Sequence, residues 1–151
     1  MRCRRRRTRS ATSVRWGASR RTGWVRASRR WALRRCILHS EKQWAIDTAE
    51  RIAAKLNATD KLVQAAYPIN TDDPLAPFLA DIAAAARDNQ GDMMMCGHVD
   101  YLLRAASKLV CGDETCKVVE FKPGNGTVAC LEGQGDDWFV SWMWRQDHAA
   151  G

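Results

Sequence analysis

The sequence lacks several features that would assign it to a class of protein. None of its apolar runs approaches the ~18 to 20 residues of a transmembrane helix, and its N-terminus lacks the apolar core of a secretory signal. Its six cysteines are too scattered for a small disulfide scaffold, and CGDETC, with Cys111 and Cys116, has no second pair at zinc spacing. We therefore expect a soluble cytoplasmic protein with no membrane, metal or cofactor. We interpret CGDETC as a plain loop.

Acidic residues are missing from one part of the chain only. Residues 1–36 contain 14 arginines and no Lys, Asp, Glu or His, so they carry a charge of +14. Residues 37–151 contain ten Lys and Arg against 17 Asp and Glu, so they carry −7. The net charge of +7 therefore averages a basic segment and an acidic body. We divide the chain into an Arg-rich segment (1–36), a folded domain (37–146) and a short tail (147–151).

The Arg-rich segment has no helical or alternating periodicity, and four interpretations of it are open. Arginines interleaved with Trp16, Trp24 and Trp31 are suited to weak nucleic-acid binding, by phosphate neutralisation and base stacking. An Arg- and Ser-rich, acid-free stretch is also typical of a targeting segment. The stretch is equally compatible with a disordered tail, or with a misread start or reading frame joined to a genuine domain.

The run Met93–Cys96 is followed by Gly97 and His98 and then by the helical pattern of Val99 to Val110. This order predicts a buried strand, a tight turn and a helix N-terminus. In α/β proteins, ligands bind outside the carboxyl ends of parallel strands, where the first N–H groups of the next helix favour an anion. The sequence therefore places a candidate site at His98.

A second unit of the same kind begins at Ile37. Ile37 and Leu38 are typical of a strand end, and Ser40 with Gln43 forms a capping-box pattern. Apolar residues then recur on one face of a helix that ends at Asn57, namely Ala45, Ala49, Ile52, Ala53 and Leu56.

The rest of the folded part predicts a loop, a helix and three strands. Residues 67–77 form a Pro- and Asp-rich loop, and residues 74–89 a helix with Asp73 as its N-cap. Residues 117–121, 127–132 and 138–144 are expected to be strands joined by hairpins. The predicted fold is α/β, a mixed, mainly parallel sheet flanked by helices, parallel in the middle and antiparallel toward the C-terminus.

Four segments together are similar to one family. ILHSEKQWAIDTAERIAAKL, NTDDPLAPFL, MMMCGHVDYLLRAASKLV and FKPGNGTVACLE resemble, in the right order, segments of the SixA-type phosphohistidine phosphatases of the histidine phosphatase superfamily. The resemblance covers about residues 36 to 146. It implies a phosphoglycerate mutase-like fold, and a sheet that lacks its first strand because the N-terminal Arg-His-Gly motif is missing. A neighbouring strand would then be an exposed, aggregation-prone edge.

The resemblance also implies the residues of a phosphate site. In the family, the histidine of the Arg-His-Gly motif attacks phosphorus, and two arginines and the histidine of a Gly-His turn hold the phosphate. Here His98 is the one intact counterpart, as a catalytic and substrate-binding residue with Gly97 beside it. Ser40 marks the turn, Trp44 stands where the helix-start arginine is expected, and Arg15 of Arg15-Trp16-Gly17 is the nearest counterpart of the first arginine.

The expected function follows from these losses. Without the nucleophile and one arginine, hydrolysis of a phosphoramidate or phosphomonoester should be strongly impaired. The expected partner is a phosphorylated protein or a small phosphate ester. The alternatives are a non-catalytic domain that binds phosphate or a phosphoprotein, and nucleic-acid binding through residues 1–36.

Overall fold

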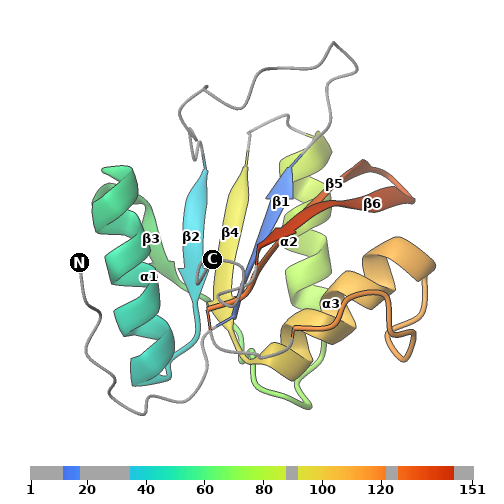
Figure 1. The fold of residues 1–151 in the computed structure, drawn as a ribbon, viewed down its shortest axis with the longest axis horizontal. Helices are drawn as coiled ribbons and strands as arrows, with labels where there is room; N and C mark the ends of the chain where they lie inside the picture. Colours follow the sequence, from blue (N-terminus) through green and yellow to red (C-terminus); the bar gives the residue numbers. More distant parts are fainter. Residues whose placement is uncertain (1–11, 18–34, 88–91, 122–125, 145–151) are drawn as a thin grey trace, which may run out of the picture.

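The computed structural model describes residues 12–17, 35–87, 92–121 and 126–144, which form one six-stranded sheet with helices on both faces (Figure 1). The strands are β1 (Thr12–Gly17), β2 (Cys36–His39), β3 (Leu62–Gln64), β4 (Met93–Gly97), β5 (Val128–Gln134) and β6 (Asp137–Trp144). The helices are α1 (Gln43–Leu56), α2 (Ala76–Arg87) and α3 (Val99–Cys111), with a short 3-10 helix, η1 (Thr59–Lys61).

The strand order is β3-β2-β4-β1-β5-β6. Strands β3, β2 and β4 are parallel, β1 runs antiparallel to β4 and parallel to β5, and β6 is antiparallel to β5. The mixed α/β class predicted from the sequence is therefore confirmed, as is the antiparallel pairing at the C-terminus. The prediction that the middle of the sheet is parallel is wrong for one pair of strands, because β4 and β1 at the centre are antiparallel.

The sheet has a strand where the sequence predicts that one is missing. Strand β1 lies within the Arg-rich segment and pairs on both sides, Val14 lying opposite Met95 of β4 and Ala129 of β5. The backbone N–H and C=O groups of β4 and β5 need partners inside a sheet, and the backbone of β1 lies in register with both of them. The prediction that the sheet lacks its first strand, which left an edge beside β4, is therefore wrong.

The two faces of the sheet are covered by different helices. Successive residues of β4 alternate between faces, as a strand requires: Met93 and Met95 belong to one core cluster, and Met94 and Cys96 to the other. The alanines of α1 pack against the face of Met94, and α2 and α3 cover the opposite face (Figure 1). All five residues of β4 are buried, which explains why its sequence is continuously apolar.

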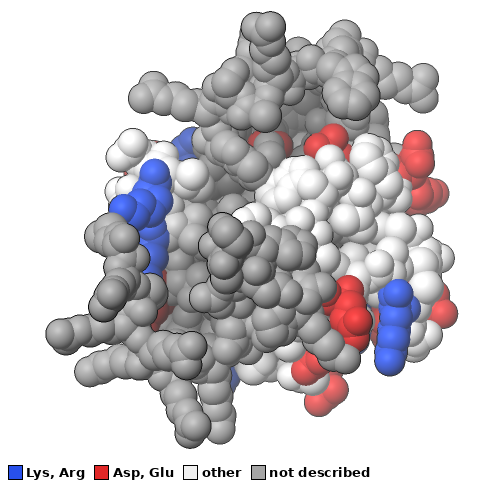
Figure 2. All heavy atoms as spheres, viewed as in Figure 1, with Lys and Arg blue, Asp and Glu red and all other residues white. Residues whose placement is uncertain are grey.

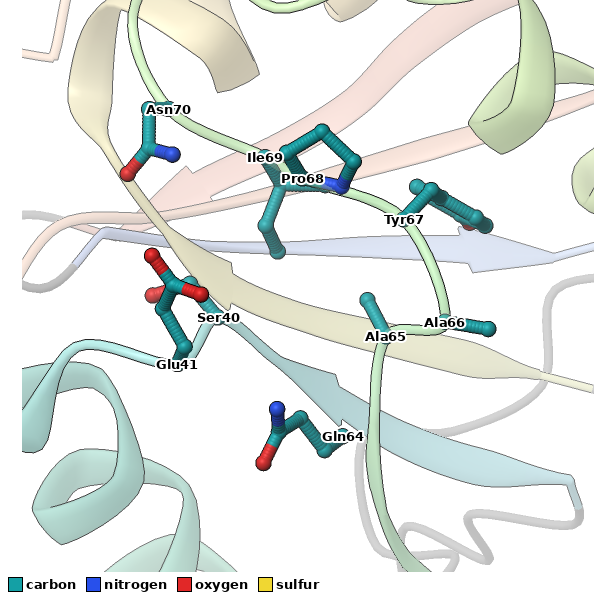
Figure 3. A pocket seen from close by; sticks show the side chains of 9 residues that line it. All are labelled: Ser40, Glu41, Gln64, Ala65, Ala66, Tyr67, Pro68, Ile69 and Asn70. Carbon is teal, nitrogen blue, oxygen red and sulfur yellow. The ribbon is translucent and has the colours of Figure 1, made fainter.

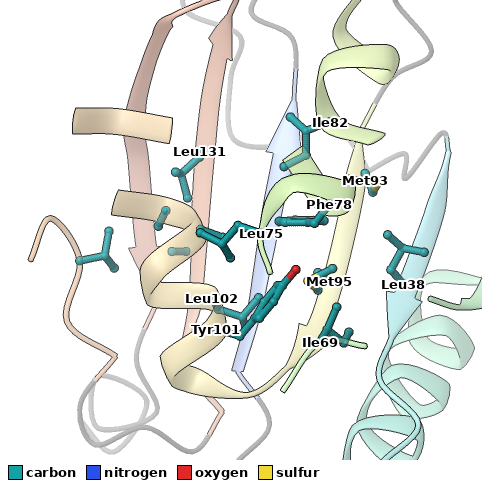
Figure 4. Packing of buried hydrophobic residues seen from close by; sticks show 14 of the residues in the cluster. Leu38, Ile69, Leu75, Phe78, Ile82, Met93, Met95, Tyr101, Leu102 and Leu131 are labelled. Carbon is teal, nitrogen blue, oxygen red and sulfur yellow. The ribbon is translucent and has the colours of Figure 1, made fainter. Parts of the chain in front are cut away.

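The larger core lies between the sheet and the helix pair α2 and α3. Phe78 and Ile82 of α2 and Tyr101 and Leu102 of α3 meet Met95 there (Figure 4). Phe78, Tyr101, Leu102 and Met95 have no solvent exposure. The cluster includes apolar residues from six strands and helices, namely β2, α2, β4, α3, β5 and β6, so the ends of β2 and β4 are held on a rigid framework.

The predicted strand at residues 117–121 is not a strand. These residues have no strand pairing, although Val119 and Phe121 are buried in the larger core. Their apolar alternation therefore reflects burial of alternate side chains and not membership of the sheet. The two later strands are confirmed as β5 and β6, which are joined by a tight turn at Gly135 and Asp136.

Strand β3 and the start of α2 also differ from the sequence-based expectation. The sequence showed no signal for β3, a three-residue edge strand whose position is fixed by pairing with β2. Asp73 does not cap α2, because its carboxylate accepts hydrogen bonds from the N–H and the amide of Asn70, at 2.6 and 2.9 Å. Helix α2 begins three residues later, at Ala76.

The surface charge in the described part is unevenly spread. Figure 2 shows acidic side chains scattered over the right half of this face, with basic charge among them at the lower right, and further basic side chains along the left edge, on the side of α1. Helix α1 contributes exposed Arg51 and Lys55. None of the helices within the described ranges has the length and apolar character needed to cross a bilayer.

Two buried ionisable groups predict how stability responds to alkaline pH. Burial raises the pKa of the Cys96 thiol to about 12 and that of the Tyr101 hydroxyl to about 12. A group with a raised pKa stabilises the fold fully below its ordinary pKa and loses that contribution as pH rises toward the folded value. We expect a free energy of unfolding about 2 kcal/mol lower near pH 10.5 than near pH 8, measured by urea titration.

The variant Cys96→Ala separates the contributions of the Cys96 thiol and the Tyr101 hydroxyl to this pH dependence. It should unfold at lower urea concentration at neutral pH, because a buried side chain is shortened, but its stability should fall less steeply between about pH 9 and 10.5. An identical pH slope in the variant and the parent chain would contradict the assignment to Cys96.

Candidate functional site

The carboxyl ends of β2 and β4 bring together two segments that are far apart in the sequence. His39 pairs with Cys96, and the N–H of Ser40 donates to the carbonyl of Cys96 at 3.2 Å. The Ser40 bend therefore lies beside Gly97 and His98, at the sheet edge that the sequence predicts for a site. Ser40 is 2% exposed, so it is a buried part of this edge.

His98 occupies the N-cap position of α3. Its backbone is extended (φ −64°, ψ 136°), and its carbonyl accepts the first helical hydrogen bond, from Leu102 at 3.0 Å. The His98 side chain makes no capping hydrogen bond to the first N–H groups of the helix. The His98 side chain is half-buried, which keeps the ring at the surface of the site.

Trp44 is in direct contact with His98. The two rings pack edge to face, with centroids 4.8 Å apart and planes at 85°. Trp44 is the second residue of α1, and α1 also begins without a side-chain cap, with Lys42 at its N-cap. Two helix N-termini therefore face the same region, and the Trp44 and His98 rings lie between them.

The predicted capping box is wrong in its details. Ser40 is not the N-cap of α1. Its hydroxyl oxygen accepts a hydrogen bond from the N–H of Lys42 at 3.3 Å, outside the helix, and Gln43 donates to Asp47 instead of reaching back. The Nδ1 of His39 donates to the carbonyl of Ser40 at 3.0 Å. Because a carbonyl only accepts, this bond fixes the proton on Nδ1 of His39.

A cavity of about 290 Å³ opens beside the Ser40 bend (Figure 3). Its lining includes Ser40, Glu41, Gln64, Asn70 and the loop between them, and Ile69 points from that loop toward the strand ends. A Cβ built on Gly97 would lie 3.7 Å from Cδ1 of Ile69, so Gly97 adjoins this cavity. The lining contains one carboxylate and no Lys or Arg, which disfavours an anion inside the cavity itself.

The loop that lines the cavity is held by two side chains from the helices. Tyr67 donates its hydroxyl hydrogen to Asp81 of α2 at 2.7 Å, and Arg104 of α3 donates to the carbonyl of Thr71 at 2.7 Å. Burial and the neighbouring Asp81 carboxylate raise the pKa of Tyr67, which keeps it protonated as a donor. Arg104 was not predicted from the sequence, because its partners lie far away in the chain.

The strand register places the backbone of Arg15 away from the candidate site at Ser40 and His98. It lies opposite Met94 of β4, three residues before Gly97, because β1 runs antiparallel to β4. At about 3.3 Å per residue its Cα is roughly 10 Å from the carboxyl edge. The structure thus brings together Ser40, Trp44, Gly97 and His98, while the backbone of Arg15 lies nearer the opposite edge.

Comparisons of the chain with protein-family models, with curated proteins and with solved structures found no match. Among the described residues, no group of three or more His, Cys, Asp or Glu side chains is placed to hold a metal ion. The chemistry of the site must therefore be argued from its own residues. They offer an imidazole, an indole and two helix N-termini without a capping side chain at the N-cap residue.

Proposed function

We propose that the chain is a phosphohistidine phosphatase-like domain that binds a phosphorylated ligand at the carboxyl ends of β2 and β4 and hydrolyses it only with strongly impaired activity. The ligand is a phosphoramidate or phosphomonoester, carried by a protein or by a small molecule, and the proposed location is the cytoplasm. The fold that we propose for residues 37–146, together with strand β1 of the same sheet, is phosphoglycerate mutase-like.

The contact between Trp44 and His98 carries this proposal. The two residues come from two of the segments that resemble the family, and their ring centroids are 4.8 Å apart. They lie at two helix ends whose N–H groups lack side-chain caps. Such ends favour an anion, and a neutral or charged imidazole donates to a phosphate oxygen.

The chemistry of the same residues explains why hydrolysis should be impaired. Phosphoryl transfer needs a nucleophile in line with the leaving group and fixed cations around the developing charge. Trp44 provides one neutral donor where an arginine would provide a charged fork. The resemblance to the family gives His39 a place in the Ser40 turn and not at the nucleophile position, so we do not assign it as a substitute nucleophile.

Binding of a phosphohistidine peptide tests the proposal. We expect weak, saturable binding that competes with inorganic phosphate, and His98→Ala should weaken it about two- to tenfold, the effect of losing one hydrogen bond. Isothermal titration calorimetry at fixed pH and salt measures both. His39→Ala is the matched control, because it removes an imidazole five residues before Trp44 whose Nδ1 donates to the carbonyl of Ser40.

Two outcomes would contradict the proposal. Equal affinity of the parent chain and of His98→Ala for the peptide would show that His98 does not contact the ligand. Multiple turnovers of the peptide that depend on His98 would show that hydrolysis is intact, which would contradict the impaired activity.

A further inference from the structure

The segment after α3 contains two cysteines that the chain brings into contact. Cys111 is the last residue of α3, and Cys116 follows five residues later. Their Sγ atoms are in direct contact, 2.7 Å apart. Both residues are free thiols, Cys111 exposed and Cys116 half-buried, so small reagents reach them.

The fold of the turn explains the contact. Gly112 has a positive φ of 75°, the left-handed conformation that glycine adopts without a Cβ clash, and it ends α3 by donating its N–H to the carbonyl of Lys108. The Asp113 carboxylate then accepts hydrogen bonds from the N–H and the hydroxyl of Thr115, both at 2.9 Å. These two features reverse the chain and return Cys116 to the end of the helix.

A salt bridge fixes this turn against the rest of the domain. Glu114, the residue between Asp113 and Thr115, accepts a hydrogen bond from Arg104 of α3 at 2.8 Å. Arg104 also donates to the carbonyls of Thr71 and Asp73 in the loop before α2. The two sulfurs are thus held close by the contacts of the turn between them, so little conformational entropy remains to be lost when they bond.

We propose that Cys111 and Cys116 form a thiol–disulfide site that reacts with low-molecular-weight disulfides and closes into an intramolecular disulfide. The thiolate of exposed Cys111 attacks the small disulfide, whose S–S bond breaks and releases one small thiolate. The thiolate of Cys116 then attacks Sγ of Cys111, forms the Cys111–Cys116 bond and expels the second small thiolate. The two protein thiols lose two electrons and two protons, and the small disulfide is reduced to two thiols.

Glutathione disulfide added to the folded, full-length chain tests the site. Lys108 and Lys117 flank the pair, so trypsin releases both cysteines in one peptide, residues 109–117. The expected product is this peptide lighter by two hydrogens, seen by mass spectrometry. Cys111→Ser and Cys116→Ser should each leave the remaining cysteine as a mixed disulfide with glutathione.

Two controls show whether the closure rate depends on the folded turn or only on the short distance between the two cysteines in the sequence. Closure should be about tenfold or more faster in the folded chain than in urea, because the fold holds the sulfurs together. Gly112→Ala, which strains the turn at positive φ, should slow closure about fivefold. Gly135→Ala carries the same kind of strain (φ 61°) in the β5–β6 turn and should leave the closure rate unchanged.

Three results would overturn the proposal. Equal closure rates in folded and urea-unfolded chain would show that the structure does not prepare the pair. A peptide carrying two glutathione adducts would show that Cys116 does not resolve the mixed disulfide. A cross-link from residues 109–117 to another cysteine, in the same or a second chain, would show that the pair is not the preferred partner.

Discussion

Replacing Val14 by proline should lower the free energy of unfolding by about 3 kcal/mol or more. Val14 is in the middle of β1, with Met95 on one side and Ala129 on the other. A proline has no N–H to donate, and its ring is not tolerated in a strand that pairs on both sides. The loss should appear in urea unfolding followed by circular dichroism, as a transition at much lower denaturant concentration or no folded baseline.

Val14→Thr is the matched control for this experiment. Threonine keeps the β-branched shape and the backbone N–H, so the variant should remain folded with a much smaller loss of stability. If Val14→Pro unfolds at the same urea concentration as the parent chain, residues 12–17 do not pair between β4 and β5. The Arg-rich segment would then be dispensable for the fold, as expected if residues 1–36 are a disordered tail or a misread start.

Replacing Trp44 by arginine should strengthen the binding of inorganic phosphate about ten- to hundredfold. A guanidinium beside His98 would add hydrogen bonds to a charged group, worth about 1.5 to 3 kcal/mol. The position is the second residue of α1, where the helix N-terminus also favours the anion. Calorimetric titration with phosphate at two salt concentrations measures the gain and its electrostatic part.

Gln43→Arg is the matched control, because it adds the same charge one residue earlier. Gln43 is exposed and its side chain is directed along α1 to Asp47, so an arginine there should raise phosphate affinity far less. Equal gains in the two variants would show a general charge effect, and no gain in Trp44→Arg would exclude Trp44 from the proposed site. Neither variant should hydrolyse a phosphohistidine peptide efficiently, because the nucleophile is still missing.

The elements with a strong hydrophobic pattern were predicted correctly. The apolar run at Met93 became β4, buried along its whole length, and the periodic segment after His98 became α3. Helix α1 ends at Leu56 with Asn57 in the left-handed conformation, as its sequence indicates. Burial of one face or of a whole strand leaves a periodicity that is visible in the chain itself.

The predictions that were wrong or missing concern segments whose structure depends on a partner far away in the sequence. Strand β1, which lies within the Arg-rich segment, carries no such pattern, and β3 is only three residues long. Residues 117–121 alternate like a strand but are buried without strand pairing. Local sequence does not specify these outcomes, because a strand exists only when another strand supplies its hydrogen bonds.

For the candidate site, the sequence by itself determined the two strand–turn–helix units and the position of His98 at the second of them. Only the tertiary structure decided that Trp44 packs against His98, that β1 runs antiparallel and takes Arg15 away from that edge, and that Cys111 meets Cys116. The physical reason is that hydrophobic periodicity is a local property, whereas strand direction and side-chain contacts depend on how the whole chain packs.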